Sequence, residues 1–219
     1  MLISRNIRLS QPEQMELQKF LKEHQERGTI CPSKSPYAAA FFFIKKRNGK
    51  LQLVQDYWPV NEWTVQNRYL LLLIPQLIDC LQNCTLFTKF DIKWGYNTVR
   101  IKEGDKWKAV FTMNKGLFEP TVMFFGLTNS PATFQTMMNT LFWDLIAAEK
   151  MTVYMDDMAI HIKKEEGETE EEHIRQHRKI VNEVLNILHW HDLFLNPEKC
   201  NFKLPYINFL GIWVGEGKV

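Results

Sequence analysis

The sequence predicts an α+β fold, with antiparallel strands backed by helices, from three patterns. Two β-prone apolar runs flank the adjacent carboxylates Asp156 and Asp157, where a two-residue hairpin connection would fall. A second hairpin is indicated by Asn48-Gly49, because this dipeptide suits the positive φ angles of a tight turn. Ser130-Pro131 begins a segment with apolar residues at helical spacing. The 219 residues, 45% hydrophobic, can bury a substantial core as one domain or two tightly joined subdomains.

The N-terminal part predicts a helix followed by a hairpin. Residues 10–13 form a capping box with a proline near the helix start, and Leu17, Phe20 and Leu21 make a narrow apolar stripe behind it. A loop over residues 32–37 leads into a strand at 38–46, which returns as a strand at 50–58. The lysines beside the turn fit either a solubilised edge hairpin or a phosphate-binding one.

A strand at residues 86–92 carries a third carboxylate. Alternation places Leu86, Thr88, Phe90 and Ile92 on one face, and Phe87, Lys89 and Asp91 on the other. If this strand pairs beside the carboxylate hairpin, Asp91 joins Asp156 and Asp157 in an all-oxygen cluster suited to Mg²⁺ or Mn²⁺ rather than zinc. Two such ions could activate a sugar hydroxyl and stabilise a leaving phosphate. The alternative is that each Asp is a turn residue.

Adjacent buried carboxylates repel each other, so we expect a cationic partner near them.

The remaining segments predict two strands, two helices and a final strand. The strands are expected at residues 100–111 and 116–125 and at 207–214, with a turn after 214. The stripe of the first helix consists of Phe134, Met137, Met138, Leu141, Phe142, Leu145 and Ile146, and Trp143 falls off it. After an acidic loop at 165–172, a second helix has a predicted buried face of Ile174, Val181, Val184, Leu185 and Leu188.

Charge and cysteine content restrict the class of protein. The net charge of +2 means that any nucleic-acid affinity must come from local basic patches. The four cysteines form no CxxC pair and no signal-peptide pattern is present, which indicates reduced thiols in an intracellular protein. The pairs Cys80/Cys84 and His173/His177 do not have zinc-finger spacing and are read as ordinary helix residues. The apolar runs are too short for a membrane span.

Several motifs, in order and at matching spacing, resemble a known family. They are FTKFDIKWGYNTVRIKEGDKWKAVF, FEPTVMFFGLTNSPATFQ, VYMDD, LNPEKC and INFLG. The chain is identified by them as similar to the reverse transcriptases of gypsy-type LTR retrotransposons, particularly fungal forms, over nearly its whole length. The resemblance implies one reverse transcriptase domain over residues 1–219, with fingers at about 1–66 and 99–129 and a palm at about 67–98 and 130–219. Thumb, connection and RNase H regions are not expected within it.

The resemblance also implies roles for individual residues. Asp91, Asp156 and Asp157 would be catalytic and would hold two Mg²⁺ (or Mn²⁺) ions for RNA-directed DNA synthesis, with a dNTP and a primed RNA or DNA template as partners. The implied nucleotide-binding residues are Lys46, Tyr96, Phe125, Gly126 and Lys199, and the implied primer grip is Phe209, Leu210 and Gly211. From the residues alone, Tyr96 could be an ordinary half-buried aromatic and Lys199 an exposed turn lysine.

The sequence departs from the family pattern at five positions. Gln52 and Trp58 replace arginines, of which the first contacts the triphosphate in the family, and glutamine or tryptophan does not supply an arginine's planar fork of donors. Cys31, Leu71 and Trp143 are further departures, and all five are reachable by single C-to-T transitions. Our hypothesis is a truncated and partly decayed copy. The alternatives are a catalytically inactive remnant and a nucleic-acid-binding module without turnover, in a cytoplasmic particle or the nucleus.

Overall fold

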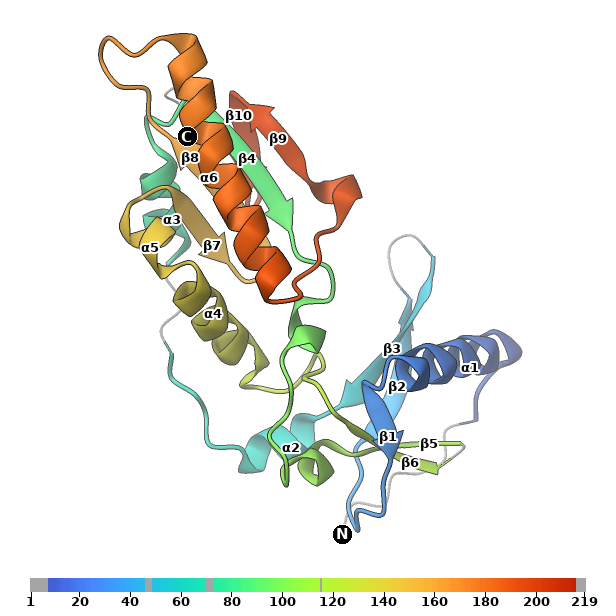
Figure 1. Ribbon diagram of the computed structural model, residues 1–219. Helices are drawn as coiled ribbons and strands as arrows, with labels where there is room; N and C mark the ends of the chain where they lie inside the picture. Colours follow the sequence, from blue (N-terminus) through green and yellow to red (C-terminus); the bar gives the residue numbers. More distant parts are fainter. Residues whose placement is uncertain (1–7, 46–48, 70–72, 115, 216–219) are drawn as a thin grey trace. The chain divides into compact units, whose positions relative to one another are not determined.

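The computed structural model describes residues 8–45, 49–69, 73–114 and 116–215 (Figure 1). The chain divides into two units, each built from two separate stretches of sequence: Met1–Asn67 with Tyr96–Ser130, and Arg68–Gly95 with Pro131–Val219. Lys46, Asn48 and Leu71 lie outside the described residues.

The first unit contains a helix, a hairpin and a three-stranded sheet. Its elements are α1 (Gln11–Glu26), β1 (Ile30–Pro32), β2 (Ala40–Lys45), β3 (Leu51–Asp56), α2 (Trp58–Trp63), the 3₁₀ helix η2 (Lys106–Ala109), β5 (Phe111–Met113) and β6 (Gly116–Pro120). A further 3₁₀ helix, η1 (Gly95–Thr98), begins at the boundary between the units. Strands β2 and β3 pair antiparallel from Ala40↔Asp56 to Lys45↔Leu51, so the hairpin predicted there is confirmed.

Helix α1 has the predicted beginning and the predicted buried stripe. The capping box between Ser10 and Glu13 is formed, and the pKa of Glu13 is lowered by its hydrogen bonds to Ser10. Leu17 and Leu21 are each 4% exposed, and Phe20 packs against the same core cluster. The helix is therefore attached to the unit by its apolar stripe, as the sequence indicated.

The strand predicted at 100–111 is wrong. Only Arg100 makes a bridge, to Val122, before the chain turns at Gly104 with φ 84 and enters η2. The turn follows from Gly104-Asp105, because glycine takes positive φ without strain and Asp105 begins η2. Of the strand predicted at 116–125, residues 116–120 form β6.

The second unit is built around a four-stranded antiparallel sheet in the order β7-β8-β4-β9. Its elements are α3 (Ile74–Leu81), β4 (Leu86–Asp91), α4 (Ser130–Leu141), α5 (Trp143–Ala147), β7 (Met151–Tyr154), β8 (Asp157–Ile162), α6 (Glu170–Trp190), the 3₁₀ helix η3 (Pro197–Lys199), β9 (Asn201–Leu204), β10 (Tyr206–Phe209) and β11 (Ile212–Gly215). Helix α6 lies across one face of the sheet (Figure 1). On the other face, α3 and the β10–β11 hairpin share a core with Phe87 and Ala159. The predicted α+β fold class is confirmed.

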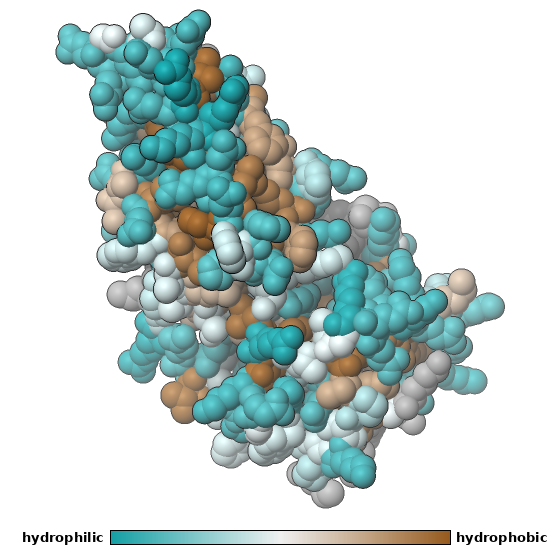
Figure 2. Space-filling view, viewed as in Figure 1, coloured by the Kyte–Doolittle hydropathy of each residue, from teal (hydrophilic) through white to brown (hydrophobic). Residues whose placement is uncertain are grey.

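Helix α6 buries two histidines that sequence reasoning treated as ordinary helix residues. It begins with a capping box between Thr169 and Glu172, and its outward surface near this end is hydrophilic (Figure 2). Three residues of the predicted face, Val181, Val184 and Leu188, are buried. His173 and His177 are also buried, and their Nε2 atoms lie 2.8 Å from the hydroxyl groups of Thr85 and Thr88, respectively.

The buried histidines predict a loss of stability in acid. Burial lowers the pKa of His161 and of His177 to about 4, from an ordinary value of 6.5. Between these values the unfolded chain binds more protons than the folded one, so stability is present above pH 6.5 and is lost as the pH falls toward 4. Between pH 7 and pH 4.5 the free energy of unfolding should fall in the unmodified chain. In His161→Gln we expect this fall to be about 2 kcal/mol smaller, as measured by urea unfolding.

The control for this experiment is His189→Gln, on the exposed last turn of α6, which should follow the unmodified chain at both pH values. An identical acid loss in the His161 variant would contradict the prediction.

The single strand predicted at 207–214 is wrong, because this segment is a hairpin. Tyr206–Phe209 pairs antiparallel with Ile212–Gly215, and the connecting Leu210 and Gly211 have φ 53 and 87. Two consecutive positive φ values are those of a tight hairpin turn, and glycine at the second position favours it. The second half of the predicted strand is therefore β11, which is the antiparallel partner of β10. Every helix in the described ranges is too short or too polar to cross a bilayer.

Candidate active site

The three predicted carboxylates come together at one end of the second unit's sheet. Strand β4 pairs with β8 so that Asp91 lies opposite Asp157, and Tyr154 of β7 also lies opposite Asp157. Met155 and Asp156 therefore form the two-residue connection, whereas the sequence placed Asp156 and Asp157 there. The backbone N–H of Ile92 donates to the carbonyl of Asp156 at 3.0 Å, which joins the turn to the end of β4.

Gln135 of α4 holds this turn in place. Its Oε1 accepts from the Met155 backbone N–H at 2.7 Å, and its Nε2 donates to the Val153 carbonyl at 3.1 Å. Met155 has φ 54, which is uncommon for a residue with a side chain. The buried glutamine thus fixes an unusual backbone directly before Asp156. Sequence reasoning missed Gln135, because nothing in its spacing distinguishes it from other polar residues of α4.

The carboxyl group of Asp156 has unfavourable surroundings. Burial, followed by the negative charges of Asp91 and Asp157, raises its pKa to about 6, and Lys199 partly opposes this shift. Its Oδ1 atom is buried and has no hydrogen-bond partner among the described residues. A buried carboxylate oxygen without a partner is costly, and a bound cation would relieve that cost.

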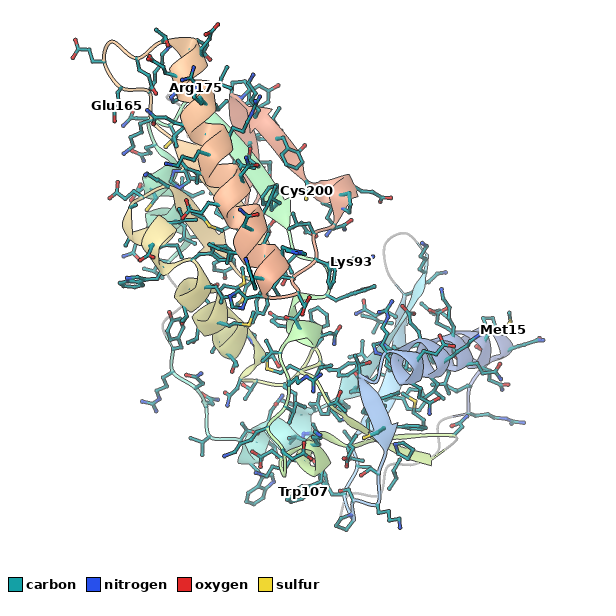
Figure 3. The ribbon with its side chains drawn as sticks, in the orientation of Figure 1. Met15, Lys93, Trp107, Glu165, Arg175 and Cys200 are labelled. Carbon is teal, nitrogen blue, oxygen red and sulfur yellow. The ribbon has the colours of Figure 1, made fainter. Side chains whose placement is uncertain are left out.

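Two lysines supply the cationic partners expected from the sequence. Lys199 Nζ lies 2.9 Å from Asp91 Oδ2, and Lys89 Nζ lies 3.0 Å from Asp157 Oδ1. The hydrogen bond to Asp91, with the charges of the three carboxylates, raises the pKa of Lys199. Lys199 was predicted as a nucleotide-binding residue and not as a partner of Asp91, and the role of Lys89 was missed although alternation placed it on the same face as Asp91. In Figure 3 this region lies between the labelled Lys93, after β4, and Cys200, before β9.

The carboxylate oxygens of this site are chemically suited to a hard divalent cation. No group of three Asp, Glu, His or Cys side chains within the described ranges is already arranged to hold a metal ion. The carboxylates offer only oxygen ligands, however, and Asp156 Oδ1 is buried without a hydrogen-bond partner. Oxygen ligands of this kind are those that Mg²⁺ and Mn²⁺ prefer.

Gly95 packs directly against Asp156. A Cβ atom at residue 95 would overlap Asp156 Oδ1 and would lie 2.8 Å from Cζ of the fully buried Phe134. Only glycine therefore leaves room for the Asp156 carboxyl in this position. No sequence signal pointed to Gly95, because it lies in no motif of turn residues.

The predicted primer-grip residues lie in the hairpin beside the carboxylates. Phe209 is fully buried at the end of β10, and Leu210 and Gly211 form the turn. A groove of about 410 Å³ runs between the hairpin and the sheet, and its lining includes Lys89, Asp91, Lys199, Asn201, Asn208 and Trp213. The second unit thus brings together the carboxylates, two lysines and the hairpin.

Three predicted nucleotide-binding residues belong to the first unit. The rings of Tyr96 and Phe125 pack edge to face with centroids 4.8 Å apart, and Phe125 is 53% exposed. Gly126 has φ 96, and its carbonyl accepts from Asn61 Nδ2 at 2.7 Å. The structure thus brings Tyr96 and Phe125 together. Lys46, another predicted nucleotide-binding residue, lies outside the described residues.

The departures from the family pattern have different surroundings. Gln52 lies in β3 opposite Ile44, and Trp58 at the start of α2 is 77% exposed. Trp143 is 65% exposed, which confirms that it falls off the apolar stripe. Cys31 is half-buried in β1, with Sγ 3.7 Å from Glu119 Oε1. The two tryptophans therefore occupy positions where a charged side chain could reach water.

Comparisons with known proteins agree on one family. The family model for "Reverse transcriptase (RNA-dependent DNA polymerase)" matches residues 44–214. The Transposon Tf2-3 polyprotein of Schizosaccharomyces pombe is 35% identical over 213 residues, covering 97% of this chain and 15% of the polyprotein. The Transposon Tf2-7 polyprotein of the same organism is 33% identical over 212 residues, with the same coverage. The chain thus spans about 15% of the length of these relatives.

Solved structures show the same fold. The foamy viral protease-reverse transcriptase in complex with RNA/DNA hybrid matches with a TM-score of 0.85 at 18% identity, over 97% of this chain and 27% of that chain. The same protein in complex with dsDNA matches with a TM-score of 0.85 at 19% identity, over 97% of this chain and 42% of that chain. At these identities the likeness concerns the fold alone.

Proposed function

The chain belongs to the reverse transcriptase family, as its motifs predicted, and we propose that it is the RNA-directed DNA polymerase domain of an LTR retrotransposon. The reaction is transfer of a nucleotide from a dNTP to a primer 3′-hydroxyl on an RNA or DNA template. The observation that carries the proposal is the pairing of Asp91 with Asp157 across β4 and β8, with Asp156 in the adjoining turn.

The proposed roles follow from the donor atoms. Reverse transcriptases generally use divalent metal ions, and we assign two Mg²⁺ or Mn²⁺ ions to Asp91 and Asp156, with Asp157 in support. When bound, such ions lower the pKa of the attacking hydroxyl and neutralise charge on the phosphates. The primer 3′-hydroxyl gives up its proton to water, its oxygen forms a bond to the α-phosphorus, and the bond from that phosphorus to pyrophosphate breaks. Lys199, kept protonated by Asp91, donates a proton to the pyrophosphate.

The two units correspond in this proposal to the fingers and the palm. Tyr96 would exclude a ribose 2′-hydroxyl, and Phe125 and Gly126 would line the nucleotide site beside it. Lys46 would contact the triphosphate, and Phe209, Leu210 and Gly211 would hold the primer end. The template and primer would be held mainly through their backbones. All cysteines in the described ranges are free thiols, which supports an intracellular site, in a cytoplasmic particle or the nucleus.

The alternative is a folded chain without turnover. Gln52 and Trp58 favour it, because neither provides the fixed charge that an arginine offers to a triphosphate. It includes both an inactive remnant and a module that binds nucleic acid only. The carboxylates, which are intact, favour the active form.

Primer extension on an RNA template with Mg²⁺ or Mn²⁺ tests the proposal. We expect incorporation by the unmodified chain, and a kcat/KM for dNTP about tenfold higher in the Gln52→Arg, Trp58→Arg double variant, because a charge-assisted hydrogen bond to phosphate is worth about 1.5–3 kcal/mol. Gln82→Arg, on the exposed end of α3, adds a positive charge elsewhere and should change nothing.

If neither the folded unmodified chain nor the folded double variant incorporates nucleotides, the proposal is contradicted. If these inactive proteins bind a primed template in a salt-dependent manner, the chain is a nucleic-acid-binding module. If they do not bind it, the chain is an inactive remnant.

A further inference from the structure

Lys89 is placed between the carboxylates and the β10–β11 hairpin. It lies on β4 two residues before Asp91, so both side chains are on the same face of the sheet. On the adjacent strand β8, Ala159 lies opposite Lys89. The small side chain of Ala159 leaves space for the lysine to extend toward Asp157. The Lys89 side chain is 19% exposed. A lysine so deeply placed is uncommon unless its charge is paired.

The ammonium group of Lys89 joins two separate parts of the unit. It lies 3.0 Å from Asp157 Oδ1 and donates to the backbone carbonyl of Asn208 at 3.1 Å. It also lies 6.0 Å from the centroid of the Phe209 ring. One side chain thus contacts the strand that follows the carboxylate turn and the strand that leads into Leu210 and Gly211.

The apolar contacts of the hairpin do not make this connection themselves. Ile207, Phe209 and Val214 pack with Phe87 in a shared core, and such packing has little directional preference. Toward the carboxylates, the hairpin and the sheet are separated by the groove that Lys89, Asp91 and Asn208 help to line. A hydrogen bond from a charged donor is directional, so the contact of Lys89 with Asn208 can fix the hairpin relative to Asp157.

The two lysines of the site differ in exposure. The Lys199 side chain is 62% exposed and pairs with Asp91, whereas Lys89 is 19% exposed and has a second partner on the hairpin. An exposed lysine exchanges its partner readily with solvent, whereas a half-buried lysine that loses its partner leaves a charge that water solvates less well. Lys199 can therefore leave Asp91 during the reaction, and Lys89 remains on Asp157.

We propose that Lys89 is a positioning residue that fixes the β10–β11 hairpin against Asp157 and thereby sets the place of the primer end. The role in placing the primer end rests on the proposed polymerase function. The attachment of the hairpin to Asp157 does not depend on it. Lys89 does not touch the reacting atoms in this scheme. It acts through Asn208 and Asp157, whose positions it couples.

Hydrogen exchange tests the structural part without any need for activity. In Lys89→Met we expect the amides of Tyr206–Phe209 and Ile212–Gly215 to exchange about tenfold faster, the ratio for a coupling of about 1.4 kcal/mol. Lys89→Arg should exchange more slowly than Lys89→Met, because it keeps a positive charge and N–H donors for Asp157 and Asn208. Lys179→Met, which removes an exposed lysine of α6, is the matched control and should have no effect.

A double-mutant cycle identifies the partner. If Lys89 compensates Asp157, Lys89→Met should accelerate exchange much less when Asp157→Asn is already present, because no buried charge is then left alone. Equal acceleration in both backgrounds would overturn the pairing. Unchanged exchange in Lys89→Met would overturn the proposal as a whole.

Binding of nucleic acid tests the effect on the primer. Lys89→Met should weaken binding of a template with a recessed primer by about tenfold and leave binding of the unprimed template unchanged, measured by fluorescence anisotropy at fixed salt. Equal weakening for both, or none, would overturn the role in primer placement. Failure of the unmodified chain to incorporate nucleotides would count against the proposed polymerase function, and these binding ratios would still decide the role of Lys89.

Discussion

Asp156→Asn should abolish primer extension, with a loss of about 1,000-fold or more, and at the same time make the chain more stable at pH 7. The loss follows from removing a charged oxygen ligand at the site of phosphoryl transfer, where electrostatic stabilisation is usually the largest contribution. The gain follows from the surroundings of the carboxyl group, which is buried and close to Asp91 and Asp157. An amide at this position carries no charge for burial to penalise.

The pH dependence of the stability gain gives a sharp check. The pKa of Asp156 is raised to about 6 in the folded chain from an ordinary 3.8, so ionisation opposes folding as the pH rises through 6. We expect Asp156→Asn to raise the free energy of unfolding by about 1 kcal/mol at pH 7, after allowing for partial exposure of the group. The gain should shrink as the pH falls from 6 toward 3.8 and vanish well below 3.8, where the carboxyl is neutral in both states. Urea unfolding at the two pH values measures it.

The control is Asp144→Asn, which removes an exposed carboxylate of α5 and should leave both activity and stability nearly unchanged. A less stable Asp156→Asn chain would show that inactivity came from damage to the fold. Residual extension within tenfold of the unmodified chain would contradict the assignment of Asp156 as a ligand.

Gly95→Ala is expected to reduce primer extension by at least about 100-fold, although it neither removes nor adds a charged group. The new methyl group would overlap Asp156 Oδ1 and press on the ring of Phe134, which is fully buried and cannot retreat. The carboxyl must therefore move. A displacement of about 1 Å at a reacting centre can cost about 100-fold in rate. We expect the loss to be mainly in kcat, with the folded state retained at 25 °C.

Gly104→Ala separates this effect from a general cost of replacing glycine. Gly104 has φ 84, so alanine is strained there, but nothing lies within 4 Å of the added methyl group. This variant should lose about 1 kcal/mol of stability and keep its activity. Normal activity of a folded Gly95→Ala chain, measured beside it, would contradict the proposed steric role.

The carboxylate site was predictable because its elements are local and strongly patterned. Asp91 ends a strand with clear alternation, and Asp156 and Asp157 follow another, so pairing of the two strands was enough to bring the three together. The motifs then identified the family. The position of Lys89 was also available from alternation, but its contact with Asn208 depends on a hairpin that the sequence analysis read as one strand.

The missed features depend on close packing between distant segments. Gln135 and Gly95 act on the turn from α4 and η1, and no pattern along the chain encodes such contacts. The two histidines of α6 occupied buried positions because Thr85 and Thr88 supply their hydrogen bonds, which a hydrophobic pattern cannot show. The strand expected at 100–111 was wrong because Gly104 and Asp105 made a turn in a β-prone stretch.

The central place of β4 in its sheet sets the order in which the chain can acquire structure during synthesis. Residues 86–91 pair with residues 157–162 on one side and with part of 201–204 on the other, so both neighbours emerge from the ribosome much later. Until then β4 has two unpaired edges and exposes Leu86, Phe87 and Phe90, a state prone to association with other chains. Such long-range pairing is slow to form. The strand that carries Asp91 is therefore synthesised early, but its pairing with both neighbouring strands is completed late. Nascent chains that stop before residue 157 should be the most prone to aggregate.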